Sequence, residues 1–323
     1  MDATRQAIFD HDLDEAQGWG VRAIIRLKLF YYLFSRIRQN RTLREELRPA
    51  LGENGIARKI DLFLRDDGGM FKHYAYGRIQ GRRSLRGARV LVPGVGYGRN
   101  LAQLAAFRPK EIVAFDFYEY PEDWEYLKKS LGERFGVNIT FLTGDFDVVP
   151  ESYRGSFDAI VSDAVLEHVP DLPKFMSYSE LFLKEGGVFF ASFGPIWYGP
   201  SGDHVEWGPD NLFDHLLLSR AAYAKQVAAR IAVAEHDSCD PGFMGQEELF
   251  SYLAVDTYLN ELLRRPSFEK MCIAAKISSK AVALFRRHPN FHRTLDEANI
   301  PLFDRFCSGF YVWLVRRGPE TKT

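Results

Sequence analysis

Three glycines at alternate positions, Gly94, Gly96 and Gly98, come shortly after the apolar run at 90–92. Glycine lets a chain turn tightly and lets a ligand approach the backbone, because no Cβ atom stands in the way. A buried strand that runs into such a loop, with a helical segment after it, therefore indicates a ligand cradle. The dinucleotide fingerprint G-x-G-x-x-G is excluded, because its third glycine would fall at Arg99.

Carboxylates follow the next two apolar runs. Asp116 closes the run at 112–115. An acid at the tip of a second strand accepts hydrogen bonds from a ribose diol, and two charge-assisted bonds offset the cost of desolvating it. The next run, at 139–142, ends in Gly144, Asp145 and Phe146.

Apolar runs alternate with helix-like segments through the middle of the chain. A fourth run at 157–161 ends in Ser162 and Asp163, and a fifth at 186–193 follows the helix-like segment 172–184. This alternation predicts an α/β fold with a doubly wound parallel sheet. Ligand sites in such a sheet lie at the carboxyl ends of the strands.

These residues make the chain similar to the class I S-adenosylmethionine (SAM)-dependent methyltransferases, over 88–195 well and over 266–318 more loosely. The segment at 162–170 resembles the small-molecule branch, which includes quinone-pathway and type 11 methyltransferases. The resemblance implies SAM as cofactor and S-adenosylhomocysteine as product. It also implies that Asp145 faces the adenine amino group and Phe146 the adenine ring. The residues assigned to the cofactor are Gly94, Gly96, Gly98, Asp116, Phe117, Gly144, Asp145, Phe146, Ser162 and Asp163.

The resemblance further implies a seven-stranded, mostly parallel sheet with its last two strands at about 268–276 and 306–317, and a helix between them at 278–288. The predicted parts are a helical N-terminal extension, a SAM-binding Rossmann-like core, a helical cap between strands five and six, and the C-terminal part of the core sheet. In that order, they cover 1–86, 87–200, 201–265 and 266–323.

A loop rich in glycine and proline, 194–208, follows the fifth predicted strand and carries His204. Functional groups gather on such loops, so we expect this one beside the methyl donor. A hydroxyl acceptor must lose a proton, and His204, with a usual pKa near 6.5, is the first candidate base, oriented by Asp203 or Glu206. His168 is the second candidate. The alternative is that His204 bonds the loop backbone or shapes the pocket, and that His168 packs beside the cofactor.

The two acids and the histidine at 203–206 also have the types that suit a divalent ion. Their spacing matches no recognised ligand pattern, so no metal site is expected. Trp197, Tyr198 and Trp207 are predicted to stack on a sugar or a flat ring, or alternatively to pin the loop against the cap. A glycan or another hydroxylated small molecule is therefore the leading acceptor.

Three functions remain open on these residues. The first is an O-methyltransferase acting on a small molecule or glycan. The second keeps the cofactor but uses a carbon or nitrogen acceptor, or a protein or RNA. The third is a non-catalytic SAM-fold scaffold subunit, suggested by the long helical additions and by Pro93, which stands where the family usually has an acid.

The overall composition agrees with a cytoplasmic enzyme. The net charge is −1, with 42 basic and 43 acidic residues, so nucleic acid is not expected as a partner. Three widely spaced cysteines predict neither a disulfide framework nor a zinc site. The segment 19–38 is apolar but is interrupted by five basic residues, so it is expected to pack on the domain or to touch a membrane surface without crossing it. Homo-oligomerisation is left open.

Overall fold

The computed structural model describes residues 6, 85–98, 101–205, 208, 210–233 and 249–318. The predicted N-terminal extension over 1–86 lies almost wholly outside these residues. The segment 19–38, Glu206 and Trp207 also lie outside them.

Seven strands form one sheet in the order β3-β2-β1-β4-β5-β7-β6. The strands from β1 to β5 pair in parallel, whereas β7 runs antiparallel to both β5 and β6. The predicted fold class, a seven-stranded and mostly parallel α/β sheet, is therefore confirmed. The strand bounds are β1 Arg89–Pro93, β2 Glu111–Asp116, β3 Asn138–Thr143, β4 Phe157–Asp163, β5 Leu183–Phe193, β6 Phe268–Ile277 and β7 Cys307–Arg316.

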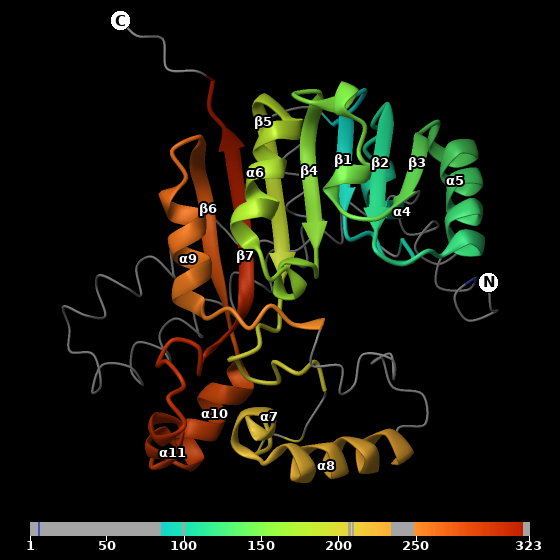
Figure 1. Ribbon diagram of the computed structural model, residues 1–323. Helices are drawn as coiled ribbons and strands as arrows, with labels where there is room; N and C mark the ends of the chain where they lie inside the picture. Colours follow the sequence, from blue (N-terminus) through green and yellow to red (C-terminus); the bar gives the residue numbers. More distant parts are fainter. Residues whose placement is uncertain are drawn as a thin grey trace, which may run out of the picture.

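Helices cover both faces of the sheet. On one face, leucines of α4 (Leu101–Ala105) and α5 (Pro121–Phe135) pack with β1 and β2. On the other, α6 (Leu172–Phe182) and α9 (Val255–Arg264) bury aromatic and aliphatic side chains against β4 and β5. Figure 1 shows α6 and α9 side by side over the same face. Each face of the sheet thus has its own apolar core.

Four more helices lie beyond the carboxyl ends of the parallel strands (Figure 1). They are α7 (Asp214–Leu217), α8 (Arg220–Val233), α10 (Ser279–Arg287) and α11 (Phe291–Glu297). The sequence predicted α10, whose first turn is capped by Ser278 Oγ accepting from Ala281 N at 3.2 Å, but not α11. These helices therefore lie at the edge of the sheet where α/β folds bind their ligands.

Local sequence explains where α5 begins and ends. Pro121 occupies its first turn, where a missing N–H costs nothing, and Glu122 and Asp123 follow at the positive end of the helix dipole. Gly136 ends it with a left-handed φ of 70°. None of the described helices combines the length and the apolar character needed to cross a membrane.

Candidate active site

Two of the three glycines in the loop after β1 have different structural roles. Gly94 has a φ of +64°, and a Cβ placed there would lie 2.3 Å from Val165 Cγ2. Gly96 has a φ of +53°, but its Cβ would meet no atom of the described residues within 4 Å. Gly94 is thus required by packing against the segment that follows β4, whereas Gly96 faces open space where a ligand can reach the backbone.

Asp116, at the tip of β2, ties that strand to the glycine loop. Its Oδ2 accepts a hydrogen bond from Gly96 N at 2.7 Å, and its Oδ1 accepts from Tyr118 N at 3.1 Å. Trp124 of α5 donates from Nε1 to the carbonyl of Gly96 at 2.8 Å. The neighbouring Phe117 ring is 71% exposed. The tip of β2 therefore presents a carboxylate and an aromatic ring at the open side of the loop.

Phe146 does not have the surroundings that the sequence suggested. Its side chain is only 1% exposed. Its ring stacks on that of Tyr178 at a centroid distance of 5.3 Å and meets that of Phe175 edge-on at 5.0 Å. The predicted contact of this ring with adenine does not fit that placement, because the ring already belongs to the core beneath α6. Asp145 is half-buried, accepts from Phe146 N at 2.7 Å and pairs with Lys174 at 3.3 Å.

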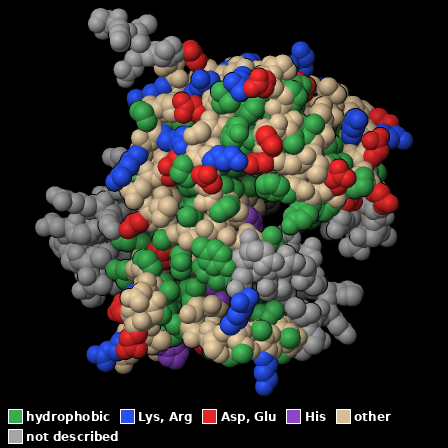
Figure 2. Space-filling view, viewed as in Figure 1, with side chains coloured by type: hydrophobic (Ala, Val, Ile, Leu, Met, Phe, Trp, Pro, Cys, Tyr) green, Lys and Arg blue, Asp and Glu red, His purple; other side chains and the backbone are tan. Residues whose placement is uncertain are grey.

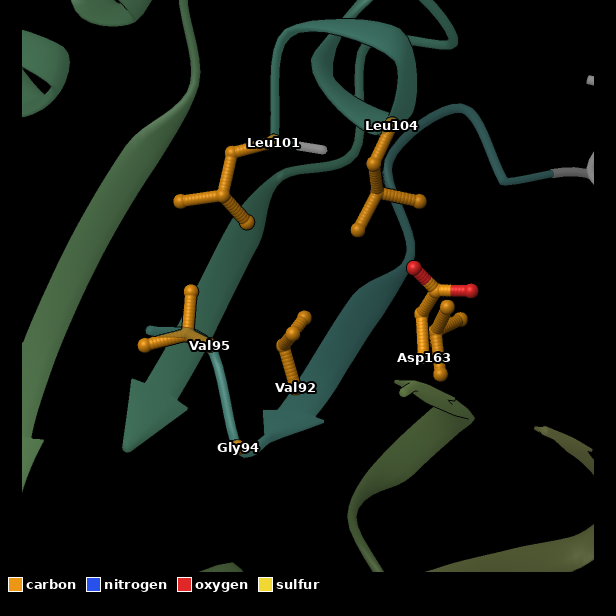
Figure 3. Close-up of a pocket in the computed structure, with 7 residues that line it drawn as sticks. Val92, Gly94, Val95, Leu101, Leu104 and Asp163 are labelled. Carbon is orange, nitrogen blue, oxygen red and sulfur yellow. The ribbon is translucent and has the colours of Figure 1, made fainter. Parts of the chain in front are cut away.

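A hollow lies beside the glycine loop, and its space of about 330 Å³ includes open solvent. In Figure 3 the side chains of Val92 and Val95 point toward those of Leu101 and Leu104 across this space. Asp163, at the end of β4, supplies the carboxylate at its margin. Next to it, Ser162 is buried, and its hydroxyl has no hydrogen-bond partner among the described residues.

His204 sits in the loop after β5 in a left-handed conformation, with a φ of +60°. Its Nε2 lies 3.0 Å from the carbonyl oxygen of Pro195. Burial, together with the nearby charge of His168, lowers the pKa of His204 to about 4. The expectation of an ordinary pKa near 6.5 was therefore wrong, because the imidazole is largely removed from water.

Two hydrogen bonds of Asp203 go to residues other than His204, so its predicted role in orienting His204 stays a prediction. Its Oδ2 accepts from the Tyr223 hydroxyl at 2.6 Å, and its Oδ1 accepts from Val205 N at 3.3 Å. Asp203 is buried, and its hydrogen bond with Tyr223 connects the loop to α8. Its role in the structure is to hold the loop that carries His204. Glu206, the other predicted partner, lies outside the described residues.

His168 and His204 do come together. Their ring centroids are 5.1 Å apart, and both rings lie against Phe250. His168 belongs to a single 3₁₀ turn, η3 (Leu166–His168), directly after β4. Its Nδ1 lies 2.7 Å from the carbonyl oxygen of Leu249. The two candidate bases thus share one site at the carboxyl edge, although 35 residues separate them in the chain.

Glu167 is the site residue that the sequence reasoning did not single out. It is fully buried, and its Oε1 accepts from Gly194 N at 2.9 Å. Burial raises the pKa of this carboxyl, with the charge of His168 acting in the opposite direction. Its position beside His168 in the segment 162–170 was the available signal.

Trp197 pins the loop and is not free to stack on a ligand. Its indole is 9% exposed and packs edge-on against His215, with Phe250 and Tyr252 also in ring contact. His215 in turn lies 2.8 Å from the carbonyl of Trp197 through Nε2. Of the two interpretations of this aromatic residue, the structure agrees with the one in which it holds the loop.

Comparison with known proteins finds that part of this chain is similar to methyltransferases. The family model described as a methyltransferase domain matches residues 91–191. A ubiquinone biosynthesis O-methyltransferase from Xanthomonas oryzae pv. oryzae is 29% identical over 117 residues, which make up 35% of this chain and 46% of the relative. This chain spans about half the length of the curated relatives it matches.

Solved structures are more distant. An S-adenosylmethionine-dependent methyltransferase from Mesorhizobium loti is 18% identical, with a TM-score of 0.43, covering 74% of this chain and 96% of that one. The phosphoethanolamine N-methyltransferase 2 of Haemonchus contortus, in complex with S-adenosylhomocysteine, is 14% identical, with a TM-score of 0.44, covering 85% and 60%. Similarities this distant carry no argument about the acceptor.

Residues 91–191 thus match a methyltransferase domain, and the sheet order is the one expected for the predicted fold class. Over these residues the match agrees with the family that the sequence predicted. The residues present fit the cofactor of this class, because the open face of Gly96 and the Asp116 carboxylate lie together at the tip of the sheet. The assignment of single residues to SAM stays a prediction.

Proposed function

We propose that this chain transfers the methyl group of SAM to a hydroxyl oxygen of a small molecule or glycan. The observation that carries the proposal is the pair of imidazoles, His168 and His204, held at the carboxyl edge of the sheet. Val165, three residues before His168, packs against Gly94 of the glycine loop. The pair is therefore adjacent to the predicted cofactor cradle. The O-methyltransferase activity named for the Xanthomonas relative supports the same acceptor atom.

On the cofactor side, Asp116 would bind the ribose hydroxyls, and Gly96 would let the ligand approach the backbone. The exposed Phe117 ring would lie beside the adenine of SAM. When bound, SAM supplies an electrophilic methyl group on a sulfonium. The protein then has to hold the acceptor oxygen in line with that methyl group and keep water away from it.

On the acceptor side, the tautomer of His204 is fixed by its surroundings. A backbone carbonyl only accepts hydrogen bonds, so Nε2 of His204 carries the proton that it donates to Pro195 O. Nδ1 is then the basic nitrogen of this ring. With its pKa lowered to about 4, the ring is neutral near pH 7, so Nδ1 accepts a hydrogen bond from the acceptor hydroxyl and takes its proton as the O–C bond forms.

The test is a methyl-transfer assay with the full chain and methyl-labelled SAM. Matched pairs of acceptors that differ only in the acceptor atom, such as a catechol and the corresponding aminophenol, are offered together with simple glycosides. We expect label on oxygen in at least one hydroxylated class. Label confined to nitrogen or carbon contradicts the proposal and favours the second function considered above. Failure to bind SAM or S-adenosylhomocysteine by calorimetry also contradicts it and favours a scaffold.

A further inference from the structure

Glu167, His168 and His204 form a cluster with the chemistry of a metal site. One ligand atom of each lies within 4.8 Å of the ligand atoms of the other two. Glu167 and His168 come from the turn after β4, and His204 comes from the loop after β5. Two imidazoles and one carboxylate are the ligand set of many catalytic zinc sites, in which a further position is left to water or substrate.

Each member of the cluster has its second polar atom bonded to backbone. His168 bonds the carbonyl of Leu249 through Nδ1, and His204 bonds the carbonyl of Pro195 through Nε2. Glu167 accepts from Gly194 N through Oε1. Because carbonyls cannot donate, the unprotonated nitrogens are Nε2 of His168 and Nδ1 of His204. Metal-ligating histidines are oriented in this way by hydrogen bonds from the other ring nitrogen.

The carboxylate supplies a second, independent indication. Glu167 is fully buried, and its Oε2 has no hydrogen-bond partner among the described residues. A buried carboxylate oxygen without a partner is costly, and a bound cation offsets that cost. The two histidines are of intermediate burial, whereas the carboxylate is fully buried.

We propose that Glu167, His168 and His204 bind one divalent transition-metal ion of the zinc type. Two imidazoles favour such an ion over magnesium, which prefers oxygen ligands. Three donors bound to one zinc lie about 3.4 Å apart, so the side chains close on the ion by a small movement. This ligand set differs from the residues at 203–206 that were considered as metal ligands from the sequence. Asp203 is not part of it, and accepts hydrogen bonds from Tyr223 and Val205.

The role of the ion follows from its position and rests on the proposed function. A metal with an open coordination position binds a hydroxyl oxygen and lowers its pKa. His168 and His204 then act as ligands, and the acceptor's proton leaves to solvent. The ion would orient the acceptor oxygen beside the glycine loop, and acceptors with two adjacent hydroxyls would bind best.

The first experiment measures metal binding alone, without SAM or acceptor. The full chain is stripped with a chelator and titrated with Co²⁺, followed by visible absorption, and with Zn²⁺, followed by elemental analysis after dialysis. We expect one ion per chain and the ligand-field bands of a four- or five-coordinate Co²⁺ site. Glu167→Gln keeps an oxygen for Gly194 N but loses the charge. Both Glu167→Gln and His204→Ala should weaken metal binding at least about 100-fold.

His288→Ala is the matched control, because His288 is an exposed histidine near Asp210 on another surface. It should bind the ion like the parent. Circular dichroism and S-adenosylhomocysteine affinity check that the variants remain folded. Binding that is absent from the parent, or equal in the parent, Glu167→Gln and His204→Ala, overturns the site.

The second experiment separates the site from the proposed function. If the ion binds as expected and no hydroxyl is methylated, the proposed function fails and the metal site stands. If a hydroxyl is methylated at an unchanged rate after chelation, the proposed function stands and the role of the metal is overturned. Loss of O-methylation on chelation, with recovery on adding Zn²⁺ or Co²⁺, supports both.

Discussion

At the residue scale, Asp116 links the predicted cofactor cradle to the sheet. It accepts from the backbone of the glycine loop and from Tyr118, so its charge is held at the tip of β2 by two N–H groups. The same carboxylate is the predicted partner of the ribose diol. Its removal should therefore affect both the order of the loop and the affinity for SAM.

We expect Asp116→Ala to weaken SAM binding by about 1.5–3 kcal/mol, the loss of a charge-assisted pair of hydrogen bonds. Isothermal titration calorimetry measures the change. Asp147→Ala, which removes an exposed acid near the next strand end, is the control and should bind SAM like the parent. Equal affinity of Asp116→Ala and parent would remove Asp116 from the cofactor site.

His204 is the second residue with a separable role. Whether it acts as a base or as a ligand, its ring meets the acceptor side of the site, and no predicted cofactor contact depends on it. His204→Ala should lower kcat about 10²–10⁴-fold while SAM affinity changes by no more than a few-fold. Steady-state kinetics with calorimetry measures both. A raised acceptor KM with kcat nearly intact would instead show that His204 only shapes the pocket.

At the element scale, the junction of β1 with its glycine loop separates binding from folding. Gly96→Val places a branched side chain at a φ of +53°, so it strains the backbone, although its Cβ would meet no atom of the described residues within 4 Å. We expect a folded chain with little SAM binding. Thermal unfolding followed by circular dichroism and calorimetric titration together measure the two effects.

Gly94→Ala is the matched variant of the same loop. Its new Cβ would lie 2.3 Å from Val165 Cγ2, so it should lower the melting temperature more than Gly96→Val does. If Gly96→Val bound SAM normally, the loop at 94–98 would not be the cradle.

The elements behind the site are joined by a buried polar chain. Tyr258 of α9 donates to the carbonyl of Leu166 at 3.1 Å and shares a hydrogen bond of 2.7 Å with Ser251. Ser251 N also donates to the carbonyl of Glu167 at 2.9 Å. The turn that carries Glu167 and His168 is thus held from two sides, which preorganises the site.

At the scale of the whole molecule, charge gives no sign of a polyanionic partner. Figure 2 shows Lys, Arg, Asp and Glu interspersed over the visible face, without a large patch of one sign. This agrees with the net charge of −1 of the full sequence.

Stability should depend on pH through Asp304, which is buried and accepts from Val255 N at 3.0 Å. Burial raises the pKa of Asp304 from 3.8 to about 6. The folded state then holds this proton more tightly, so stability falls as the pH rises from about 4 to about 6. Above that window the ionised carboxylate costs about 3 kcal/mol, at 1.36 kcal/mol per pKa unit.

Asp304→Asn is neutral at every pH and keeps an oxygen for Val255 N. Relative to the parent, it should gain up to about 3 kcal/mol of stability between pH 4 and pH 7. Urea unfolding at the two pH values measures the gain. Asp210→Asn, an exposed acid that pairs with Arg287, is the control and should show a much smaller difference. A gain no larger than that of the control would contradict the assignment.

The sequence by itself determined the sheet, and it predicted the edge at which the cofactor would bind. Apolar runs, the glycine spacing at 94–98 and the acid at Asp116 are local patterns, and the strands formed within a few residues of the predicted bounds. The start of β5 at Leu183 and the helix α11 were missed, because a charged turn and a short helix carry weak periodic signals.

Only the tertiary structure decided which side chains meet. The Phe146 ring is buried in the core, and Asp203 accepts a hydrogen bond from Tyr223. Glu167 and His168 lie close to His204. Two chain segments more than thirty residues apart converge there because β4 and β5 are parallel neighbours and end at the same edge of the sheet. Spacing along the chain carries no record of such a meeting, so the cluster became visible only with the fold.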